Sequence, residues 1–404
     1  MKKRKIVISL VILLFLSSVF LAKFFSSSIG TSGDLEFINF NKNVKTLNKR
    51  EIKYIRNPNM GKINISIAAT GDIMFHTTQI ISAYDNKTGT YDFESPFKPV
   101  KKYIESADIA IGNLETVTAG REHGFTGYPR FNSPKVVVRA LKNTGYDILA
   151  TANNHSLDRG KEGIIETIDN IKTYGLKNIG TYKTPNNDIL IENVKGVKVA
   201  FLCYTYGCNG LESLLTKDEL KYMINLIDED RIKNDIEKTK LAGADFTVIF
   251  IHWGNEYHRN ASPFQKQLAE KMVKWGADII LGSHPHVVQE SDILEYNGEN
   301  KFIIYSMGNF ISNQRYETVN NRYTEDGVIV ILKLQKDYVN EIISIESIEY
   351  IPTWVNRYRK DGKYKYEILP VEEYLNNKAQ DLSKEVFSRM KKSFNSTMTK
   401  MDQR

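Results

Sequence analysis

Short runs of apolar residues, each followed directly by polar side chains, recur through the middle of the chain. Runs of this length, bounded by glycine, proline, asparagine or aspartate, are typical of strands that are buried on both faces. Five runs predict central strands, at residues 65–69, 109–111, 148–152, 246–251 and 279–281. Because all five end in groups that bind metals or phosphates, the pattern links the predicted sheet to a functional site.

The segments around these runs carry helix signals. Ser133-Pro134 and Ser262-Pro263 suit helix starts, and Gly145 and Gly276 suit the position that ends a helix. Four of the five runs follow a small residue and an aspartate, which we interpret as a helix-to-strand turn. The predicted helices cover residues 133–145, 160–174, 228–241 and 262–276. Helix, turn, strand and polar motif then repeat, which predicts an α/β fold.

Later strands follow one another without long helices between them. They are predicted near 198–204, 302–306, 327–334 and 341–350. The absence of long crossovers among the last of them predicts antiparallel pairing, and we expect a second sheet packed on the first. After a domain at 62–355, residues 356–404 are predicted to form a C-terminal extension with a helix at 379–394 that docks on the domain.

The first residues combine basic and apolar segments. Lys2 to Lys5 precede an uncharged apolar stretch from Ile6 to Ala22. Residues 1–23 therefore predict a signal-anchor or a signal peptide, and we favour an uncleaved anchor because no clear cleavage motif follows. Residues 24–61 are predicted to be a linker. The expected location is the cell membrane, with a single pass and the bulk of the chain extracytoplasmic.

Composition narrows the classes of partner. The net charge of +7 is modest, and no dense basic run lies outside the N-terminus. We therefore expect no nucleic-acid partner, whereas an anionic substrate or an anionic envelope polymer fits the charge. The two cysteines, Cys203 and Cys208, exclude a disulfide framework. They form either one short local bridge or two buried thiols.

The polar side chains after the five runs form the candidate site. Open α/β sheets place their sites at the carboxyl ends of strands, so we expect one shared pocket. A lone histidine usually has a structural role, but here four of the seven histidines sit at equivalent strand ends. The residues concerned are Asp72, Asn113, Glu115, Asn153, Asn154, His155, His252, His284 and His286.

These residue types match the ligands of a two-metal site, which uses carboxylate, imidazole and amide oxygen. Pro285 restricts the turn between His284 and His286, so both imidazoles can face the same pair of metal ions. The candidate metal ligands are Asp72, Glu115, Asn154, His252, His284 and His286. We expect two divalent ions, of Mn, Fe or Zn. His155 is the candidate general acid, and Asp158 would orient it.

Substrate-binding roles are assigned to polar residues near the same motifs. The candidates are Asn113, Asn153, Arg130, Ser306 and Asn309. For Arg130 the alternative is an ordinary loop arginine, and for Ser306 and Asn309 it is a structural turn. The chain has no G-x-S-x-G motif, P-loop or dinucleotide-binding glycine motif, which argues against those enzyme classes.

Several motifs together resemble one known family. They are Gly-Asp-Ile-Met, Gly-Asn-Leu-Glu, Asn-Asn-His-Ser-Leu-Asp-Arg-Gly, His-Trp-Gly, Gly-Ser-His-Pro-His-Val-Val-Gln and Tyr-Ser-Met-Gly-Asn-Phe, within residues 62–312. This set resembles the bacterial capsule-synthesis CapA/PgsA family, which is linked to poly-γ-glutamate production. That family is similar to calcineurin-like metallophosphoesterases, so the resemblance implies a four-layer α/β/β/α sandwich and a two-metal centre.

The resemblance also assigns residues. It places Asp72, Asn154, His252, His284 and His286 on metal-ligand positions and His155 on the general-acid position. Two residues of this chain depart from the phosphoesterase pattern.

Met74 occupies a position where the phosphoesterases carry histidine, and His76 lies two residues later. Asn113 replaces their bridging aspartate, so Glu115 becomes the candidate bridge. These changes leave open whether the protein is a metal-dependent hydrolase.

Three functions follow. The first is a membrane-anchored, extracytoplasmic, metallophosphoesterase-like protein for synthesis, export or attachment of an anionic capsule polymer. The second is a non-catalytic assembly subunit that uses the same pocket to bind the polymer or membrane subunits of a synthase. The third is an exported phosphatase or nucleotidase that acts on small phosphoester substrates.

Overall fold

The part of the chain that the computed structural model describes lies within Asn59–Arg404. The residues described are 61–185, 189–377 and 382–401. The predicted anchor at 1–23 and nearly all of the predicted linker lie outside these residues. Within the described ranges, no helix combines the length and the apolar character needed to cross a membrane.

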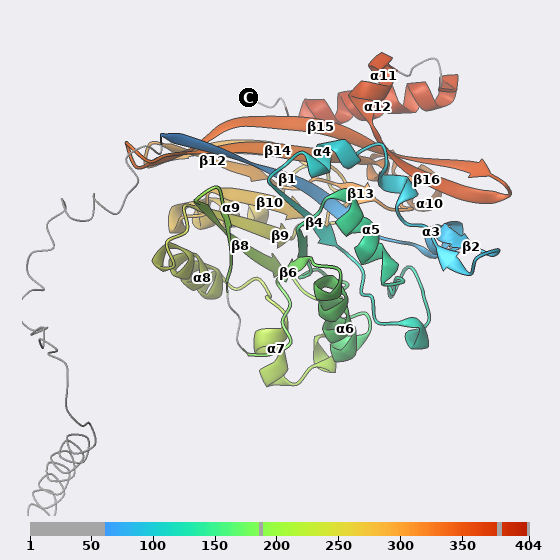
Figure 1. Ribbon diagram of the computed structural model, residues 1–404, viewed down its shortest axis with the longest axis horizontal. Helices are drawn as coiled ribbons and strands as arrows, with labels where there is room; N and C mark the ends of the chain where they lie inside the picture. The colour runs from blue at the N-terminus through green and yellow to red at the C-terminus, as the bar shows by residue number, and fades with distance from the viewer. Residues whose placement is uncertain (1–60, 186–188, 378–381, 402–404) are drawn as a thin grey trace, which may run out of the picture. The chain divides into compact units, whose positions relative to one another are not determined.

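The larger sheet contains the first three predicted strands (Figure 1). In sheet order its strands are β16 (Lys363–Pro370), β15 (Ile342–Lys360), β14 (Asp326–Asp337), β1 (Lys62–Ile73), β4 (Ile109–Leu114), β5 (Ile148–Ala150) and β6 (Lys177–Ile179). β1, β4, β5 and β6 run parallel, and β14 to β16 continue the sheet antiparallel. The short strand β13 (Asn309–Ile311) pairs with the end of β1.

The second sheet holds the other two strands that end in the predicted site. Its order is β11 (Ser291–Tyr296), β12 (Glu299–Ile304), β10 (Ile279–Ser283), β9 (Phe246–His252), β8 (Val197–Thr205) and β7 (Leu190–Val194). Of the later predicted strands, 198–204 and 302–306 lie in this second sheet as β8 and β12, whereas 327–334 and 341–350 became β14 and β15 of the larger sheet. β14 instead pairs with β1 over eight residues, from Lys62 opposite Asp337 to Ala69 opposite Val330.

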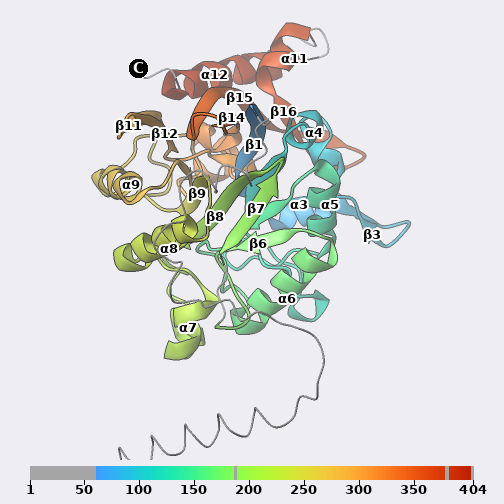
Figure 2. The same cartoon turned by 60° about the vertical axis from the view of Figure 1, so that its left-hand side comes forward.

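The two sheets pack face to face, and helices cover their outer faces (Figure 2). The inner core joins residues such as Ile67 and Ile111 of the larger sheet to Phe201 and Val248 of the second. α4 (Lys101–Glu105) and α5 (Val136–Thr144) pack on the larger sheet, and α8 (Glu229–Leu241) and α9 (Pro263–Trp275) on the second. The predicted mixed α/β fold with more than one sheet is confirmed.

Local signals explain where the helices begin and end. The Ser262 hydroxyl accepts a hydrogen bond from the backbone of Gln265, and the Gln265 side chain accepts one from the backbone of Ser262. These two hydrogen bonds form a capping box at the start of α9. Gly276 ends the helix with φ 118°, a conformation that glycine adopts at least cost. Gly145 ends α5 in the same way, with φ 112°.

The remaining elements, apart from α6, are short. The helices are α3 (Thr77–Ala83), α6 (Gly160–Thr173), α7 (Lys217–Met223) and α10 (Tyr316–Val319), with 3-10 turns η1 (Ser95–Phe97), η2 (Arg121–His123), η3 (Glu212–Leu214) and η4 (Arg322–Glu325). β2 (Tyr84–Asp85) and β3 (Thr90–Tyr91) form a small hairpin.

The C-terminal segment is joined to the larger sheet. β15 runs through residue 355, the predicted domain boundary, and β16 pairs with it. α11 (Val371–Asn377) and α12 (Lys384–Met401) then lie along β15 (Figure 1). Trp354, Leu369 and Met390 form a small apolar cluster beneath them. The helix predicted at 379–394 therefore corresponds to α12, which extends further toward the C-terminus.

Candidate metal centre

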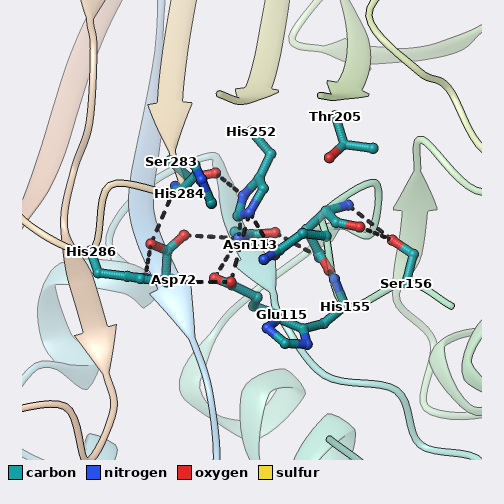
Figure 3. Close-up of polar contacts among 12 residues, drawn as sticks. Asp72, Asn113, Glu115, His155, Ser156, Thr205, His252, Ser283, His284 and His286 are labelled. Carbon is teal, nitrogen blue, oxygen red and sulfur yellow. Dashed lines mark hydrogen bonds and ion pairs between the residues drawn. The ribbon is translucent and has the colours of Figure 1, made fainter. Parts of the chain in front are cut away.

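The ends of strands from both sheets meet at one buried cluster (Figure 3). Asp72 near the end of β1 pairs in register with Asn113 of β4, and both are fully buried. From the second sheet, His252 ends β9, and His284 and His286 follow β10. The prediction placed these strand ends at a single pocket, and the structure shows that two facing sheets supply them.

Two groups of side chains within the described residues have metal-binding geometry, and they share one histidine. Asp72, Glu115 and His286 form the first group, and Glu256, His284 and His286 form the second. In each group the candidate ligand atoms lie within 4.8 Å of one another. Carboxylate and imidazole ligands of this kind suit Mn, Fe or Zn. The shared His286 places the two groups side by side.

Unsatisfied buried atoms test whether a cation fits this cluster. Glu115 Oε1 and His284 Nδ1 are buried and make no hydrogen bond within the described structure. Buried polar atoms are normally paired, so each such atom calls for a partner. Glu115 Oε1 also lies 3.7 Å from His252 Nε2 and 3.8 Å from His286 Nε2. A divalent cation among these atoms would satisfy them together, so the residues fit the expected metal.

Electrostatics favour the same interpretation. Burial raises the pKa of Glu115 well above its ordinary value, and the neighbouring Asp72 carboxylate adds to this effect. Burial would also raise the pKa of Asp72, but the hydrogen bond and charge of His286 outweigh it and lower that pKa. Burial, with neighbouring imidazoles, lowers the pKa of His252 well below its usual range and that of His284 to about 3. Metal binding requires neutral imidazoles, which the lowered pKa values of His252 and His284 favour, and a bound cation would stabilise the ionised form of Glu115 that burial disfavours.

The backbone at the cluster has unusual φ angles and a close contact between two chain segments. His284 and His286 have φ of 96° and 57°, on either side of Pro285. Such strained positions persist where surrounding structure enforces them, and they concentrate at functional sites. A Cβ at residue 71 would lie 2.0 Å from the carbonyl oxygen of Gly308, which accepts a hydrogen bond from the Asp72 backbone. Glycine at position 71 therefore lets Asp72 reach the cluster.

His155 contacts Asp158 as the sequence predicted. Its Nδ1 lies 2.8 Å from Asp158 Oδ2, and both side chains are buried. The Phe131 ring packs edge-on against His155 at 4.7 Å, and the Phe131 backbone donates to the same carboxylate oxygen. The pair is thus held in one orientation beside the cluster. The general-acid role of His155 stays a prediction.

Three asparagines connect the strand ends. Asn113 Nδ2 donates to Asp72 Oδ1 at 2.8 Å, and Asn113 Oδ1 accepts from Asn153 Nδ2 at 3.0 Å. Asn154 Oδ1 lies 2.9 Å from His252 Nε2. Asn113 therefore presents its amide nitrogen, rather than its oxygen, to the carboxylates. In this geometry Asn113 and Asn153 organise the cluster, whereas Asn154 faces a candidate ligand.

The other predicted substrate-binding residues lie apart from these contacts. Ser306 is buried in a turn, where its hydroxyl accepts from the backbone of Gly308. Asn309 is buried and donates to Gln314 and to the backbone of Thr324. Arg130 is exposed, on a loop beside Phe131.

The two residues that depart from the phosphoesterase pattern also have defined places. Met74 is fully buried at the position where the resemblance predicts a histidine ligand. His76 Nδ1 accepts a hydrogen bond from the backbone of Asn313, and its ring packs edge-on against Phe131. His76 is not in either metal-binding group of the described residues. It therefore does not replace the missing ligand in this geometry.

Sequence reasoning missed three residues of the site. The Tyr206 ring, 45% exposed, lies 4.5 Å from the ring of His284 and parallel to that of His252. Asn209 Oδ1 accepts from Asn154 Nδ2 at 3.3 Å. Glu256 is exposed and belongs to the second ligand group. Tyr206 and Asn209 follow the predicted strand 198–204, so the rule that sites lie at strand ends would have found them.

The two cysteines are free and buried. Cys203 Sγ lies 3.8 Å from the carbonyl oxygen of Ala152, and Cys208 Sγ lies 3.9 Å from that of Asn153. Burial raises the pKa of Cys203 to about 12. Of the two alternatives from the sequence, the structure has buried thiols, which support the segment that carries Asn154.

Comparisons with known proteins address the resemblance. A family model described as bacterial capsule synthesis protein PGA_cap matches residues 66–314. The chain is 32% identical over 262 residues to the capsule biosynthesis protein CapA of Bacillus anthracis, which covers 62% of this chain and 60% of that protein. It is 29% identical over 300 residues to the PGA biosynthesis protein CapA of Bacillus subtilis (strain 168), which covers 72% of this chain and 74% of that protein.

Among solved structures, calcineurin-like phosphoesterase YfkN from Bacillus subtilis aligns with a TM-score of 0.40 and 15% identity, over 84% of this chain and 97% of that chain. This chain spans 60% of the length of the Bacillus anthracis relative, which is less than two thirds. The family model, however, covers more than half of the chain. This chain therefore belongs to the bacterial capsule synthesis protein family.

Proposed function

We propose that this protein is a metallophosphoesterase-like enzyme that acts in the synthesis, export or attachment of an anionic capsule polymer, poly-γ-glutamate. Its family and the names of its two Bacillus relatives support the polymer. The observation that carries the chemistry is the buried cluster with two ligand groups that share His286. Its unpaired atoms on Glu115 and His284 mark places for cations.

The residues of the chain supply binding, orientation and a proton. Asp72, Glu115 and His286 would hold one divalent ion, and His284, His286 and Glu256 a second. His252, with its Nε2 3.7 Å from Glu115 Oε1, would be a further ligand. When bound, such ions polarise a phosphoryl or acyl oxygen and lower the pKa of water. Asp158 holds His155 by its Nδ1, which leaves Nε2 to hold or release a proton toward a leaving group.

Location forms part of the proposal. The basic and apolar residues 1–23 support a single-pass anchor, with the bulk of the chain outside the cytoplasm. Polymer attachment or export takes place on that side of the membrane. Protease added to intact cells should degrade residues 62–404, whereas a cytoplasmic location would leave them protected.

A second candidate function is a non-catalytic assembly subunit for a polymer synthase. Two observations favour it. Met74 places an apolar side chain where the resemblance predicts a ligand, and Asn113 turns its amide nitrogen toward the carboxylates. Such a protein would use the same pocket to bind polymer or synthase subunits without turnover.

One set of variants separates the two functions. Metal content by mass spectrometry and hydrolysis of a generic phosphodiester are measured for the purified wild type, His155→Ala, His252→Ala and the exposed control His258→Ala. The enzyme predicts that His155→Ala keeps its metal and loses about 100-fold or more in rate, as a general acid should. His252→Ala should lose both metal and rate, and His258→Ala neither. Metal binding without hydrolysis in the wild type would support the assembly subunit instead.

A further inference from the structure

Two arginines lie beside the His155–Asp158 pair without an acidic partner. Arg159 follows Asp158 directly, and Arg130 precedes Phe131, whose backbone donates to the Asp158 carboxylate. Within the described residues, neither guanidinium forms an ion pair with an aspartate or glutamate. By contrast, Lys161, two residues further on, pairs with Glu219. Cations next to the candidate acid have therefore been left unpaired.

Hydrogen bonds hold the two arginines on one support. Arg159 Nη1 donates to the carbonyl oxygen of Asp158 at 2.8 Å, and its Nη2 donates to Thr126 Oγ1 at 2.6 Å. The same Thr126 hydroxyl donates to the carbonyl oxygen of Arg130 at 2.6 Å. Backbone hydrogen bonds in both directions between Thr126 and Asn132 close this loop. Both arginines therefore lie on a segment whose conformation is held by internal hydrogen bonds.

The arrangement is electrostatically unfavourable in the free protein. Partial burial lowers the pKa of Arg159, and the like charge of Arg130 adds to this effect. The charge of Asp158 partly offsets that cost. Asp158 bonds to His155 and to the Phe131 backbone through Oδ2 only, its Oδ1 is buried without a hydrogen-bond partner, and it forms no ion pair with either arginine within the described residues. Two neighbouring cations gain most from an added anion, especially where solvent is partly excluded.

We propose that Arg130 and Arg159 form a subsite for a free α-carboxylate of a γ-linked glutamate chain. The inference rests on the proposed function, since it names how that substrate is recognised. A planar guanidinium matches a carboxylate with two hydrogen bonds. A polymer with one carboxylate per unit can present one group to the arginines while another part of the chain lies at the metal centre. The subsite would then set the register of the polymer relative to His155.

Binding measurements test this subsite. Full-length protein loaded with Mn²⁺ is titrated calorimetrically with a γ-linked glutamate oligomer, for the wild type and for Arg130→Gln, Arg159→Gln and Arg130→Lys. Affinity should fall about threefold for Arg130→Gln and about tenfold for the more buried Arg159→Gln. Arg130→Lys keeps the charge but loses the planar guanidinium, so its affinity should fall between those of the wild type and Arg130→Gln. The control Arg139→Gln, an exposed position on α5, should bind as the wild type does.

Two further readouts separate recognition from folding. Arg159 also bonds to the backbone of Asp158, so Arg159→Gln alone is ambiguous, whereas the exposed Arg130 side chain makes no hydrogen bond or ion pair within the described residues. Metal content and melting temperature of Arg130→Gln should equal those of the wild type. If both arginine variants bind the oligomer as tightly as the wild type does, the subsite is wrong and the proposed function stands. If the wild type itself does not bind the oligomer, the proposed polymer is wrong and the subsite with it.

Discussion

Two clusters of charged side chains, each with a buried centre, pair their charges in opposite ways. The metal centre gathers two carboxylates and several imidazoles at the strand ends. The C-terminal ion-pair cluster, formed by Arg315, Glu317, Glu325, Arg357 and Arg389, lies under α12 and beside β15. In it, Glu325 accepts from Arg389 at 2.6 Å and from Trp354 Nε1 at 3.0 Å, and lies 3.4 Å from Arg315. Opposite charges are matched there.

The comparison shows that buried charged groups are paired in the structural cluster and partly unpaired in the candidate functional site. No buried atom of the C-terminal ion-pair cluster lacks a partner in the described structure, whereas Glu115 Oε1 and His284 Nδ1 do. Asp72 and Glu115 also place two acids side by side, which raises the pKa of Glu115. Paired charges hold an element in place, and conflicting charges persist where a ligand resolves them. The predictions below test this division.

The largest expected effect is on the C-terminal ion-pair cluster. Glu325→Ala removes the acid that lies 2.6 Å from Arg389. It also removes one of the two acids beside Arg315, which is almost fully buried and keeps Glu317 at 2.7 Å. Removing one member of a buried pair should lower the free energy of unfolding by about 3–5 kcal/mol. Urea unfolding measures it. The control Glu385→Ala, an exposed acid 4.0 Å from Arg389, should cost less than about 1 kcal/mol. Equal effects of the two substitutions would contradict the comparison.

At the metal centre, removing a charge should have the opposite sign. Glu115 has a folded-state pKa above its unfolded value of 4.5, so its stabilising contribution is complete below that pH and is lost as pH rises through the folded value. Glu115→Gln should therefore stabilise the metal-free protein at neutral pH, by on the order of 1–3 kcal/mol, and not in acid.

The same Glu115→Gln substitution should abolish most metal binding. Thermal unfolding in the presence of a chelator, over a range of pH, measures the stability, and mass spectrometry measures the metal. A metal-free variant that is less stable than the wild type at neutral pH would show that Glu115 is a structural acid. Retention of full metal content would remove it from the ligand set.

A smaller effect is expected for Asp326, a buried acid beside the C-terminal ion-pair cluster whose ionised form is unfavourable. Burial raises the pKa of Asp326 to about 6 from 3.8, although Ser396 donates a hydrogen bond to it at 3.0 Å. Its stabilising contribution is complete below 3.8 and is lost as pH rises through about 6. Asp326→Asn should thus add about 1–2 kcal/mol at pH values above 7 and nothing near pH 3. Equal stability of variant and wild type across this range would refute the shift.

The smallest effect concerns Tyr206, which covers the imidazoles of His284 and His252 and hydrogen-bonds to Asn154. Tyr206→Phe keeps the ring and removes the hydroxyl, so Mn²⁺ affinity should weaken about three- to tenfold, as for other groups that orient ligands. Titration with Mn²⁺ measures it, and Tyr316→Phe, at an exposed position on α10, serves as control. Unchanged affinity would assign Tyr206 to packing alone.

Much of the local structure could be predicted because local patterns determine it. The apolar run 246–251 became β9, and the serine-proline and glycine signals at 262–276 became α9. The rule that sites lie at strand ends also identified Asp72 and His286, which the structure brings together. Tyr206 escaped because its strand ends in no acid or imidazole, so residue type alone did not mark it.

By itself, the sequence determined which residues end each strand, and hence the chemistry that the cluster could hold. Burial patterns, caps and turns act over a few residues, so they can be recognised without knowledge of the fold. Only the tertiary structure decided that β14 pairs with β1, that two facing sheets supply the site, and that His286 belongs to both ligand groups. These features depend on packing between residues far apart in the chain, where small free-energy differences among alternative pairings select the partner.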